Sequence, residues 1–417
     1  MSILLKNVRV LDTNSPAHKK QVNILIKNGV ITSLSGKSAD EIYDLKGKSI
    51  SCGFFDLNAH FNDPGYEHRE DLQSGSEVAW SGGFTDICLI PATDPPIESK
   101  SDINYLVKNR VGLVDLHPIA ATSESLKGEN LTEMLDLYAA GAVGFSDGDY
   151  PLWNTELLLK ALQYTQGIKA PIIQNARDLN ISSNTQMNEG KFSTYLGLRG
   201  EPSISEELTI QRDIEVLKYS GGSLHFTKVS TAKGLELIKK AKKEGLSVTC
   251  DVSLHHLLFT DESIGDFDTI FKNTPPFRSN SDRKALIKGI KGGTVDAICS
   301  NHRPLDQESK QLEFDYADAG SISLQTFFSA LMTISEDIPL EDLLQKVVNG
   351  PRKVLKKDEI KIDKGNVAKL AILDLDESWI LNEQTNKSKS RNSPFWNKEL
   401  KGRVMGVVNG EKMILSQ

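Results

Sequence analysis

The stretch LHFTKVS at residues 224–230 is followed by STAKGLELIKKAKKEG at 230–245 and by LSVTCDVS at 246–253. The first and third segments are short apolar runs of strand length, whereas the middle segment places apolar residues at helical spacing among lysines. A strand, a helix and a second strand in this order are typical of a parallel sheet, because its crossover connections are usually helices. This part of the chain therefore predicts one β–α–β unit.

Similar apolar runs recur on both sides of this unit. They are FFDLNAH at 54–60, TDICLIPA at 85–92, VDLHPIAA at 114–121, AVGFSD at 142–147, PIIQNA at 171–176 and VDAICSNH at 295–302. Segments with helical periodicity lie between most of them, such as LTEMLDLYAAG at 131–141 and DRKALIKGIKGG at 282–293. Apolar runs interleaved with helices in this way predict the α/β class and a parallel (β/α)8 barrel over residues 53–352.

Both ends of the chain favour strands without such helices. Near the N-terminus, VNILIKNGVITSL at 22–34 contains the turn signal Asn28-Gly29 between two β-rich halves. Near the C-terminus, NVAKLAILDLD at 366–376 precedes GRVMGVVNGEKMIL at 402–415, in which Asn409-Gly410 is a second hairpin signal. We therefore expect residues 1–52 and 353–417 to form one small β-sandwich domain from the two termini.

Composition narrows the classes of function. The chain has 417 residues and a net charge of −7 without a dominant basic stretch, which argues against nucleic acid as a partner. No apolar run approaches the ~20 residues of a membrane span, and residues 1–12 do not resemble a signal peptide. The expectation is a soluble cytoplasmic protein with no membrane contact. The four cysteines form no CxxC pair, so we expect reduced, buried side chains; a zinc site built on cysteine is the alternative.

Polar side chains gather where the predicted barrel strands end. They are Asn58, His60, Asp147, Asn175, Lys228, His255, Asn301 and His302. In (β/α)8 barrels the functional residues lie at the C-terminal ends of the strands. The functional site is therefore expected among these residues.

Many spaced motifs resemble those of the dihydroorotase family of the amidohydrolase superfamily. They are GFFDLNAHFNDPG at 53–65, MNEG at 187–190, LGLRGEP at 196–202, EELTIQRD at 206–213, KVSTA at 228–232, LHHLLFTDE at 254–262, PPFR at 275–278, NHRP at 301–304 and SRNSPFWNKELKGRV at 390–404. The resemblance spans essentially the whole chain. It implies a barrel with a terminal β-sandwich, and reversible ring closure of carbamoyl-aspartate to dihydroorotate on one or two zinc ions.

The resemblance also locates the family's metal ligands, and most of them differ here. The family's first strand ends in His-x-His-x-Arg, where this chain has Asn58, His60 and Asn62. Two further ligand histidines correspond to Asn175 and Lys228. Only His60 is retained among these, and the arginine that holds the substrate carboxylate is lost.

Further differences fall on the remaining functional positions. The family's Asp-His-Ala-Pro-His segment corresponds to residues 301–305, and the family's aspartate there binds metal and acts as general base. In this chain Asn301 replaces the aspartate, His302 is kept and Leu305 replaces the last histidine. The family's two substrate-binding asparagines correspond to Ala92 and Thr274. An amide cannot accept a proton at neutral pH, so the general base is lost with the metal ligands.

The carboxylate that bridges the metals in some family members has two possible counterparts here. The segment FSDGD offers Asp147 and Asp149, and the sequence does not decide between them. His60 and Asp147 are thus the residual candidates for metal binding. Since an asparagine oxygen is a poor zinc ligand, two ligands on separate strands do not predict a tight zinc site, and no cofactor is expected.

Lys228 gives an electrostatic argument against metal. An ammonium about 3 Å from a divalent ion is repelled by about 10 kcal/mol at an effective dielectric near 20. We expect Lys228 to fill the vacated volume and to pair with Asp147. Arg303 adds a second cation, either as a pocket-filling salt bridge or as a remnant of an anion-binding site. His225, His255 and His256 are interpreted as structural histidines, and His60 is either hydrogen-bonded in the barrel mouth or a ligand.

Three functions remain open at this point. The first is a non-catalytic protein of pyrimidine biosynthesis that assembles with aspartate transcarbamoylase, with itself, or with both, as degenerate dihydroorotases of this type do. The second is an active dihydroorotase or related cyclic amidohydrolase with an altered site that uses His60, Asp147, Lys228 and His302, with zinc if this alternative holds. The third is a binding module in which Lys228 and Arg303 hold an anionic metabolite.

Overall fold

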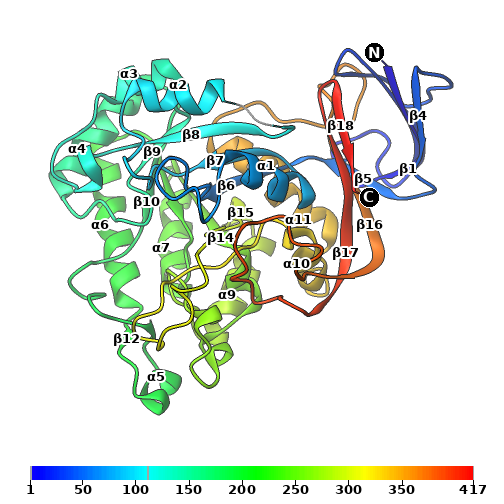
Figure 1. Cartoon of the computed structure of the whole chain (residues 1–417). Helices are drawn as coiled ribbons and strands as arrows, with labels where there is room; N and C mark the ends of the chain where they lie inside the picture. The colour runs from blue at the N-terminus through cyan, green and yellow to red at the C-terminus, as the bar shows by residue number, and fades with distance from the viewer. Residues whose placement is uncertain (1, 110–111, 417) are drawn as a thin grey trace.

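The computed structural model describes residues 2–109 and 112–416 and contains two large sheets (Figure 1). Eight parallel strands form the first sheet in the order β15-β14-β13-β10-β9-β8-β7-β6. Their bounds are β6 Phe54–Ala59, β7 Phe84–Leu89, β8 Asp115–Ala121, β9 Gly144–Ser146, β10 Ile172–Asn175, β13 Leu224–Thr227, β14 Val248–Ser253 and β15 Ala297–Cys299. All eight strands coincide with the apolar runs of the sequence.

The first sheet nearly closes into a barrel between its first and last strands. A parallel bridge joins Ala59, at the end of β6, to His302, just beyond β15. The backbone N–H of His60 donates to the carbonyl of His302 at 2.9 Å. This closure brings the segments that follow β6 and β15 together at the C-terminal end of the barrel, where the site is expected.

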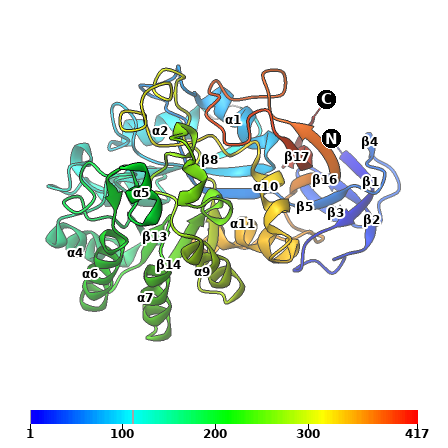
Figure 2. The ribbon, with the colours of Figure 1, turned by 90° about the horizontal axis from the view of Figure 1, so that it is seen from below.

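Helices surround the barrel, as Figure 2 shows from below. Their bounds are α1 Leu72–Ser81, α2 Lys100–Lys108, α3 Met134–Ala140, α4 Thr155–Tyr164, α5 Lys191–Leu196, α6 Ile204–Ser220, α7 Ala232–Lys243, α8 Leu254–Leu258, α9 Asn280–Lys291, α10 Phe327–Ile334 and α11 Leu340–Val354. Short 3-10 turns occupy Glu124–Leu126, Thr165–Gly167, Asp261–Ile264 and Thr269–Phe271. The β13–α7–β14 unit is the one predicted at 224–253, and the Thr231 side chain caps α7 by accepting from the N–H of Gly234.

Both ends of the chain build the second sheet, which we call the terminal sheet. Its strands are β1 Ser2–Val10, β2 Gln21–Lys27, β3 Val30–Ser33, β4 Glu41–Asp44, β5 Ser49–Cys52, β16 Lys369–Ile380, β17 Glu399–Asn409 and β18 Lys412–Leu415. They lie in the order β18-β17-β16-β5-β1-β2-β3, with β4 also paired to β1. The β2–β3 and β17–β18 hairpins turn at the two predicted Asn-Gly pairs, where Asn28, Gly29 and Gly410 adopt the positive φ that such turns require.

A buried ion cluster joins the terminal sheet to the barrel. Asp86 in β7 accepts from Arg352 Nη2 at 2.7 Å, from Lys369 Nζ at 2.6 Å and from His117 Nε2 at 2.9 Å. Burial by itself raises the pKa of Asp86, but these three basic groups together bring that pKa far below its usual range. Lys369 on β16 pairs both with Asp86 on β7 and with Asp115 on β8, so ion pairs join the two sheets.

The architecture confirms the predicted fold class, an α/β barrel accompanied by a separate sheet from the two termini. The proposed division at residues 52/53 and 352/353 stays a prediction. A short pair, β11 Met187–Asn188 and β12 Gly200–Glu201, was not expected.

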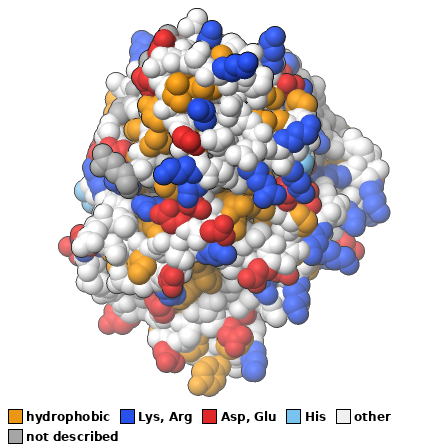
Figure 3. Space-filling view, turned by 90° about the vertical axis from the view of Figure 1, so that its right-hand side faces the viewer, with side chains coloured by type: hydrophobic (Ala, Val, Ile, Leu, Met, Phe, Trp, Pro, Cys, Tyr) orange, Lys and Arg blue, Asp and Glu red, His pale blue; other side chains and the backbone are white. Residues whose placement is uncertain are grey.

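On the face that includes the terminal sheet, charged side chains of both signs are interspersed with small hydrophobic groups (Figure 3). Within residues 2–109 and 112–416, no helix has the length and apolar character needed to cross a membrane. All four cysteines are buried and free, as expected.

Candidate functional site

A cavity of about 610 Å³ opens at the C-terminal end of the barrel, next to the site residues that the sequence singled out. Six predicted or neighbouring site residues line it, namely His60, Asn62, Ala92, Asp149, Arg303 and Leu305. The barrel therefore brings residues from the segments that follow β6, β7, β9 and β15 to one place. The remaining candidates lie in or beside the strand ends around it.

Asp149 is the centre of the polar contacts at this cavity. Its Oδ1 accepts from Lys228 Nζ at 2.6 Å, and its Oδ2 accepts from Arg303 Nη1 at 2.6 Å. His60 Nε2 lies 3.4 Å from the same Oδ2. Burial raises the pKa of the Asp149 carboxyl, but the two cations hold that pKa well below its usual range. Asp149 is therefore a carboxylate in the folded protein, and it neutralises part of the charge of Lys228 and Arg303.

Lys228 is almost completely buried, with 1% of its surface exposed. Its backbone N–H donates to Asp251 Oδ1 at 2.7 Å, and it adopts a φ of 57°, which costs a residue with a long side chain about 1 kcal/mol or more. A buried ammonium without a counter-charge would cost several kcal/mol in lost solvation. The contact with Asp149 offsets this cost and fixes the ammonium in the barrel mouth.

The expected pair between Lys228 and Asp147 is wrong. The Asp147 carboxylate instead accepts from the backbone N–H groups of Thr122 and Ser123, at 3.0 and 2.9 Å, and from the Ser123 hydroxyl. Gly148, with a φ of 67°, turns the chain between the two aspartates, so that Asp149 rather than Asp147 contacts Lys228. Burial raises the pKa of Asp147 to about 6. Asp147 therefore ties the end of β8 to the end of β9.

The structure places Arg303 and His60, whose roles the sequence left open. Arg303 forms the salt bridge to Asp149, so its guanidinium is already engaged within the chain. His60 is buried, and burial lowers the pKa of its ring to about 4. The imidazole is therefore neutral at physiological pH, and its contact with Asp149 is longer than a normal hydrogen bond.

The four asparagines of the site donate their side-chain amides to protein acceptors. Asn175 Nδ2 donates to the carbonyl of Asp149 at 3.2 Å, and Asn62 Nδ2 donates to that of Pro304 at 3.3 Å. Asn58 Nδ2 lies 3.4 Å from Thr227 Oγ1, and Asn301 Nδ2 lies 3.2 Å from Asn273 Oδ1. Asn175, Asn62 and Asn301 connect segments that follow neighbouring strands, whereas Asn58 reaches from β6 across the barrel to β13.

The remaining predicted positions are placed as follows. His302 Nδ1 accepts from the backbone N–H of Ser323 at 3.1 Å, which leaves the hydrogen on Nε2, 3.8 Å from a Glu70 carboxylate oxygen. Thr274 lies outside the cavity lining and donates its backbone N–H to the side chain of Asn273. His302 is thus held through Nδ1, whereas its buried Nε2 has no hydrogen-bond partner among the described residues.

The other three histidines near the barrel are structural, as interpreted from the sequence. Both ring nitrogens of His225 have partners, Thr249 Oγ1 at 2.9 Å and Asp251 Oδ2 at 2.8 Å. His255 contacts Ser321 Oγ at 3.0 Å, and His256 contacts the carbonyl of Pro275 at 3.1 Å. All three rings are buried, so none is available to the cavity.

The side chains at the barrel mouth do not fit a zinc ion. Zinc requires neutral imidazole, thiolate or carboxylate donors, usually three from the protein. The carboxylate closest to His60 is already bonded to two cations, and the ammonium of Lys228 lies against it. In the part of the chain that the structure describes, no three His, Cys, Asp or Glu side chains are grouped as metal ligands.

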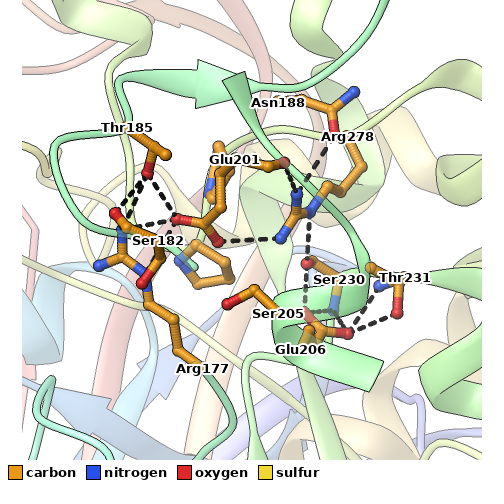
Figure 4. A network of polar contacts seen from close by, with 12 residues as sticks. Arg177, Ser182, Thr185, Asn188, Glu201, Ser205, Glu206, Ser230, Thr231 and Arg278 are labelled. Carbon is orange, nitrogen blue, oxygen red and sulfur yellow. Dashed lines mark hydrogen bonds and ion pairs between the residues drawn. The ribbon is translucent and has the colours of Figure 1, made fainter. Parts of the chain in front are cut away.

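A buried polar network, shown in Figure 4, supports the segment that carries Lys228. The Glu206 carboxylate accepts from the backbone N–H groups and hydroxyls of both Ser230 and Thr231. Arg278 donates to Ser230 Oγ at 3.0 Å and to Glu201 Oε1 at 3.1 Å. No role was predicted for Glu201, Glu206 and Arg278 from the sequence, although they lie in the motifs LGLRGEP, EELTIQRD and PPFR. The network fixes the turn that follows β13.

Fold and site together define a protein with a nearly closed eight-stranded parallel barrel, a second sheet from both termini and a cavity at the C-terminal end of the barrel. The structure is similar to the L-hydantoinase (dihydropyrimidinase) from Arthrobacter aurescens, with a TM-score of 0.87 and 23% sequence identity over 99% of this chain and 96% of that one. It is also similar to a D-hydantoinase (dihydropyrimidinase) from Thermus sp., with a TM-score of 0.84 and 17% identity over 99% of this chain and 95% of that one. At these identities the similarity concerns the fold.

Sequence comparison is more specific. A family profile described as dihydro-orotase-like matches residues 47–234. The chain is 36% identical to a dihydroorotase of Syntrophus aciditrophicus over 98% of both chains, and 35% identical to a dihydroorotase of Acetivibrio thermocellus over 99% of both. The chain therefore belongs to the dihydroorotase family of cyclic amidohydrolases.

Proposed function

We propose that this chain is a non-catalytic member of the dihydroorotase family that serves pyrimidine biosynthesis as a partner of aspartate transcarbamoylase. The observation that carries the loss of catalysis is the ion pair between Lys228 Nζ and Asp149 Oδ1, at 2.6 Å in a buried barrel mouth. A dication at this position would face the ammonium with a repulsion of about 10 kcal/mol. Amides at Asn58, Asn175 and Asn301 supply neither the ligands nor the base that hydrolysis of a cyclic amide requires.

The catalytic part of the proposal is tested by metal content and ring closure. The purified chain is expected to contain well below one zinc per molecule after dialysis against zinc, and to leave carbamoyl-aspartate unchanged. The matched control restores the family residues, as Asn58→His, Asn175→His, Lys228→His and Asn301→Asp combined. Zinc retained by this variant alone supports the proposal, whereas stoichiometric zinc in the parent chain together with turnover contradicts it.

The partner is the part of the proposal that rests on the family resemblance. We expect the chain to elute together with aspartate transcarbamoylase from a sizing column, and to raise the thermal midpoint of the transcarbamoylase. A chain that elutes alone, as a homo-oligomer, at all mixing ratios would contradict the heteromeric assembly. This result would leave the loss of catalysis intact.

The second candidate function is an active cyclic amidohydrolase with an altered site. It is favoured by the cavity of about 610 Å³, which is large enough for a small cyclic amide, and by relatives named dihydroorotase along the whole chain. In this case Lys228→Ala should abolish turnover of dihydroorotate. A flat assay with and without added zinc would remove this candidate.

The contacts of Lys228 and Arg303 bear on the third function considered from the sequence, a module that binds an anionic metabolite. An anion-binding role for Lys228 and Arg303 requires cations that are free to meet a ligand. Both cations instead share the carboxylate of Asp149, one on each oxygen. Calorimetry with carbamoyl-aspartate is therefore expected to show no binding at this pair.

A further inference from the structure

A second cavity of about 650 Å³ lies beside the barrel mouth. Its walls come from His68 and from three segments around 268–270, 305–311 and 389–396. Leu305 lines both this cavity and the one at the barrel mouth, so the two spaces lie next to each other. None of the functional positions discussed above, apart from Leu305, borders the second cavity.

Lys310 is the buried cation in the wall of this second cavity, with 8% of its surface exposed. Its Nζ donates to the backbone carbonyl of Asp318 at 2.8 Å. No carboxylate of the described residues forms an ion pair with it. The backbone of Lys310 is held by Thr269, whose hydroxyl donates to the Lys310 carbonyl at 2.7 Å. The amine is thus positioned by the chain but lacks the counter-charge that a buried ammonium needs.

The surroundings of Lys310 favour the neutral amine. Burial lowers the pKa of the Lys310 amine to about 7, and the neighbouring cation Lys272 contributes in the same direction. Asp318 and Asp268 act in the opposite direction, and Arg303 again lowers the pKa. At neutral pH a substantial fraction of this amine therefore has a free electron pair. An amine that is desolvated and close to another cation is the arrangement that activates lysine as a nucleophile.

Lys272 provides an internal comparison. It is equally buried, at 8% exposure, and its Nζ donates only to backbone carbonyls, those of Phe314 at 2.6 Å and Asp315 at 3.0 Å. Burial lowers the pKa of Lys272 as well. Lys272 does not line the cavity. The two lysines therefore share burial and partner type, and they differ in access to an open volume.

We propose that Lys310 is a nucleophilic amine that takes a small aldehyde or ketone from this second cavity and holds it as an imine. The nitrogen electron pair forms a bond to the carbonyl carbon, and a proton passes from nitrogen to the carbonyl oxygen. The carbinolamine then loses water to give the C=N bond. The step is reversible and requires neither an oxidant nor a reductant, and it is independent of the function proposed for the barrel mouth.

The test traps the imine on the intact wild-type chain. The protein is incubated briefly with acetaldehyde and cyanoborohydride at pH 7, and each lysine is quantified by peptide mass mapping. Lys310 is expected to be ethylated at least about tenfold faster than the exposed lysines, because their amines with a pKa near 10.4 are almost entirely protonated. Its labelling rate should level off above pH 7, whereas that of exposed lysines should continue to rise with pH.

Two comparisons make this test decisive. Lys310→Met should remove the fast label, and Lys272→Met should slow but not abolish the label at Lys310, because burial, the largest cause of the lowered Lys310 pKa, remains after the neighbouring cation is gone. Labelling of Lys310 no faster than that of exposed lysines would overturn the proposal. Labelling of Lys272 as fast as Lys310 would also overturn it, because burial alone, rather than the cavity, would then explain the reactivity. The two results that would overturn the proposal are measured by peptide mapping of the wild-type protein. They therefore remain available even if a variant does not fold.

Discussion

At the scale of single residues, Lys228 and Asp149 form an ion pair inside the barrel mouth. The lysine is buried and its carboxylate partner is shared with Arg303. Removing one member of such a group leaves a buried charge with fewer partners. This destabilises the protein more than replacing all members by uncharged residues would. The stability of this region therefore depends on the set being complete.

Lys228→Met is expected to lower the free energy of unfolding by about 3 kcal/mol, because Asp149 then keeps one cation instead of two in a buried position. Urea denaturation at pH 7 measures the change. The double variant Lys228→Met/Asp149→Asn should recover part of the loss, since both charges are gone. Lys233→Met is the matched control, because the Lys233–Glu236 pair is exposed and should change stability by less than about 0.5 kcal/mol. A loss as small as in the control would contradict the importance of the buried pair.

The sequence could place Lys228 at the barrel mouth but could not name its partner. The position followed from the apolar run LHFTKVS at 224–230 and from the KVSTA motif. The choice between Asp147 and Asp149 depends on the direction in which Gly148 turns the chain. It also depends on the backbone N–H groups of Thr122 and Ser123, which donate to the Asp147 carboxylate. The sequence does not indicate which backbone N–H groups will bind a carboxylate, so the structure was needed to identify the partner of Lys228.

At the scale of elements, α6 is held against the barrel by a buried carboxyl group. Asp213 accepts from Gln174 Nε2 in β10 at 2.8 Å and from Arg212 Nε at 2.7 Å. Arg212 in turn donates to the backbone carbonyls of Leu152 and Trp153, which precede α4. A single acidic residue thus links α6, β10 and the segment before α4.

This carboxyl gives a pH dependence with a definite sign. Burial raises the pKa of Asp213 to about 6, against about 4 in an unfolded chain. Between these two values the folded state binds the extra proton, so stability decreases as pH rises from 4 to 6. We expect the Asp213→Asn variant to lose this pH dependence, which amounts to up to about 3 kcal/mol in the free energy of unfolding. Urea denaturation of variant and parent at pH 4.5 and pH 7 measures the difference. Parallel curves for the variant and the parent would contradict the raised pKa.

Elements with strong local signals could be predicted, and elements held by distant partners could not. The two Asn-Gly hairpins and the β13–α7–β14 unit follow from turn chemistry and hydrophobic periodicity. The short pair β11–β12 has only two residues in each strand, too few for a period to appear. Arg278 supports this pair from 77 residues away in sequence, through its contact with Glu201 in β12.

At the scale of the whole molecule, the barrel and the terminal sheet are joined by the cluster around Asp86. We expect Asp86→Asn to lower the free energy of unfolding by about 3 kcal/mol, because Arg352 and Lys369 would lose their shared buried partner. Hydrogen exchange should then show amides of β16 opening more readily than those of β7, whereas both strands open together in the parent protein. Equal exchange in the variant would show that the two sheets are coupled by packing alone.

The division into a barrel and a terminal sheet could be predicted, because the sequence favours strands without helices at both ends of the chain and alternates strands with helices between them. The ion cluster could not, since Asp86 contacts Arg352 and Lys369 across 266 and 283 residues of sequence. Nothing local distinguishes these residues from solvent-exposed charges. Long-range electrostatic partners of this kind are visible only once the chain is folded.

The lysine that occupies the barrel mouth has a consequence for how the protein matures. An ion must be captured from a limited cellular supply, whereas an amino acid is delivered with every translated copy. We therefore expect the chain to reach its native state at the same rate in metal-starved and metal-replete cells. Chelators that strip a metalloenzyme of its activity should leave the thermal midpoint of this protein unchanged.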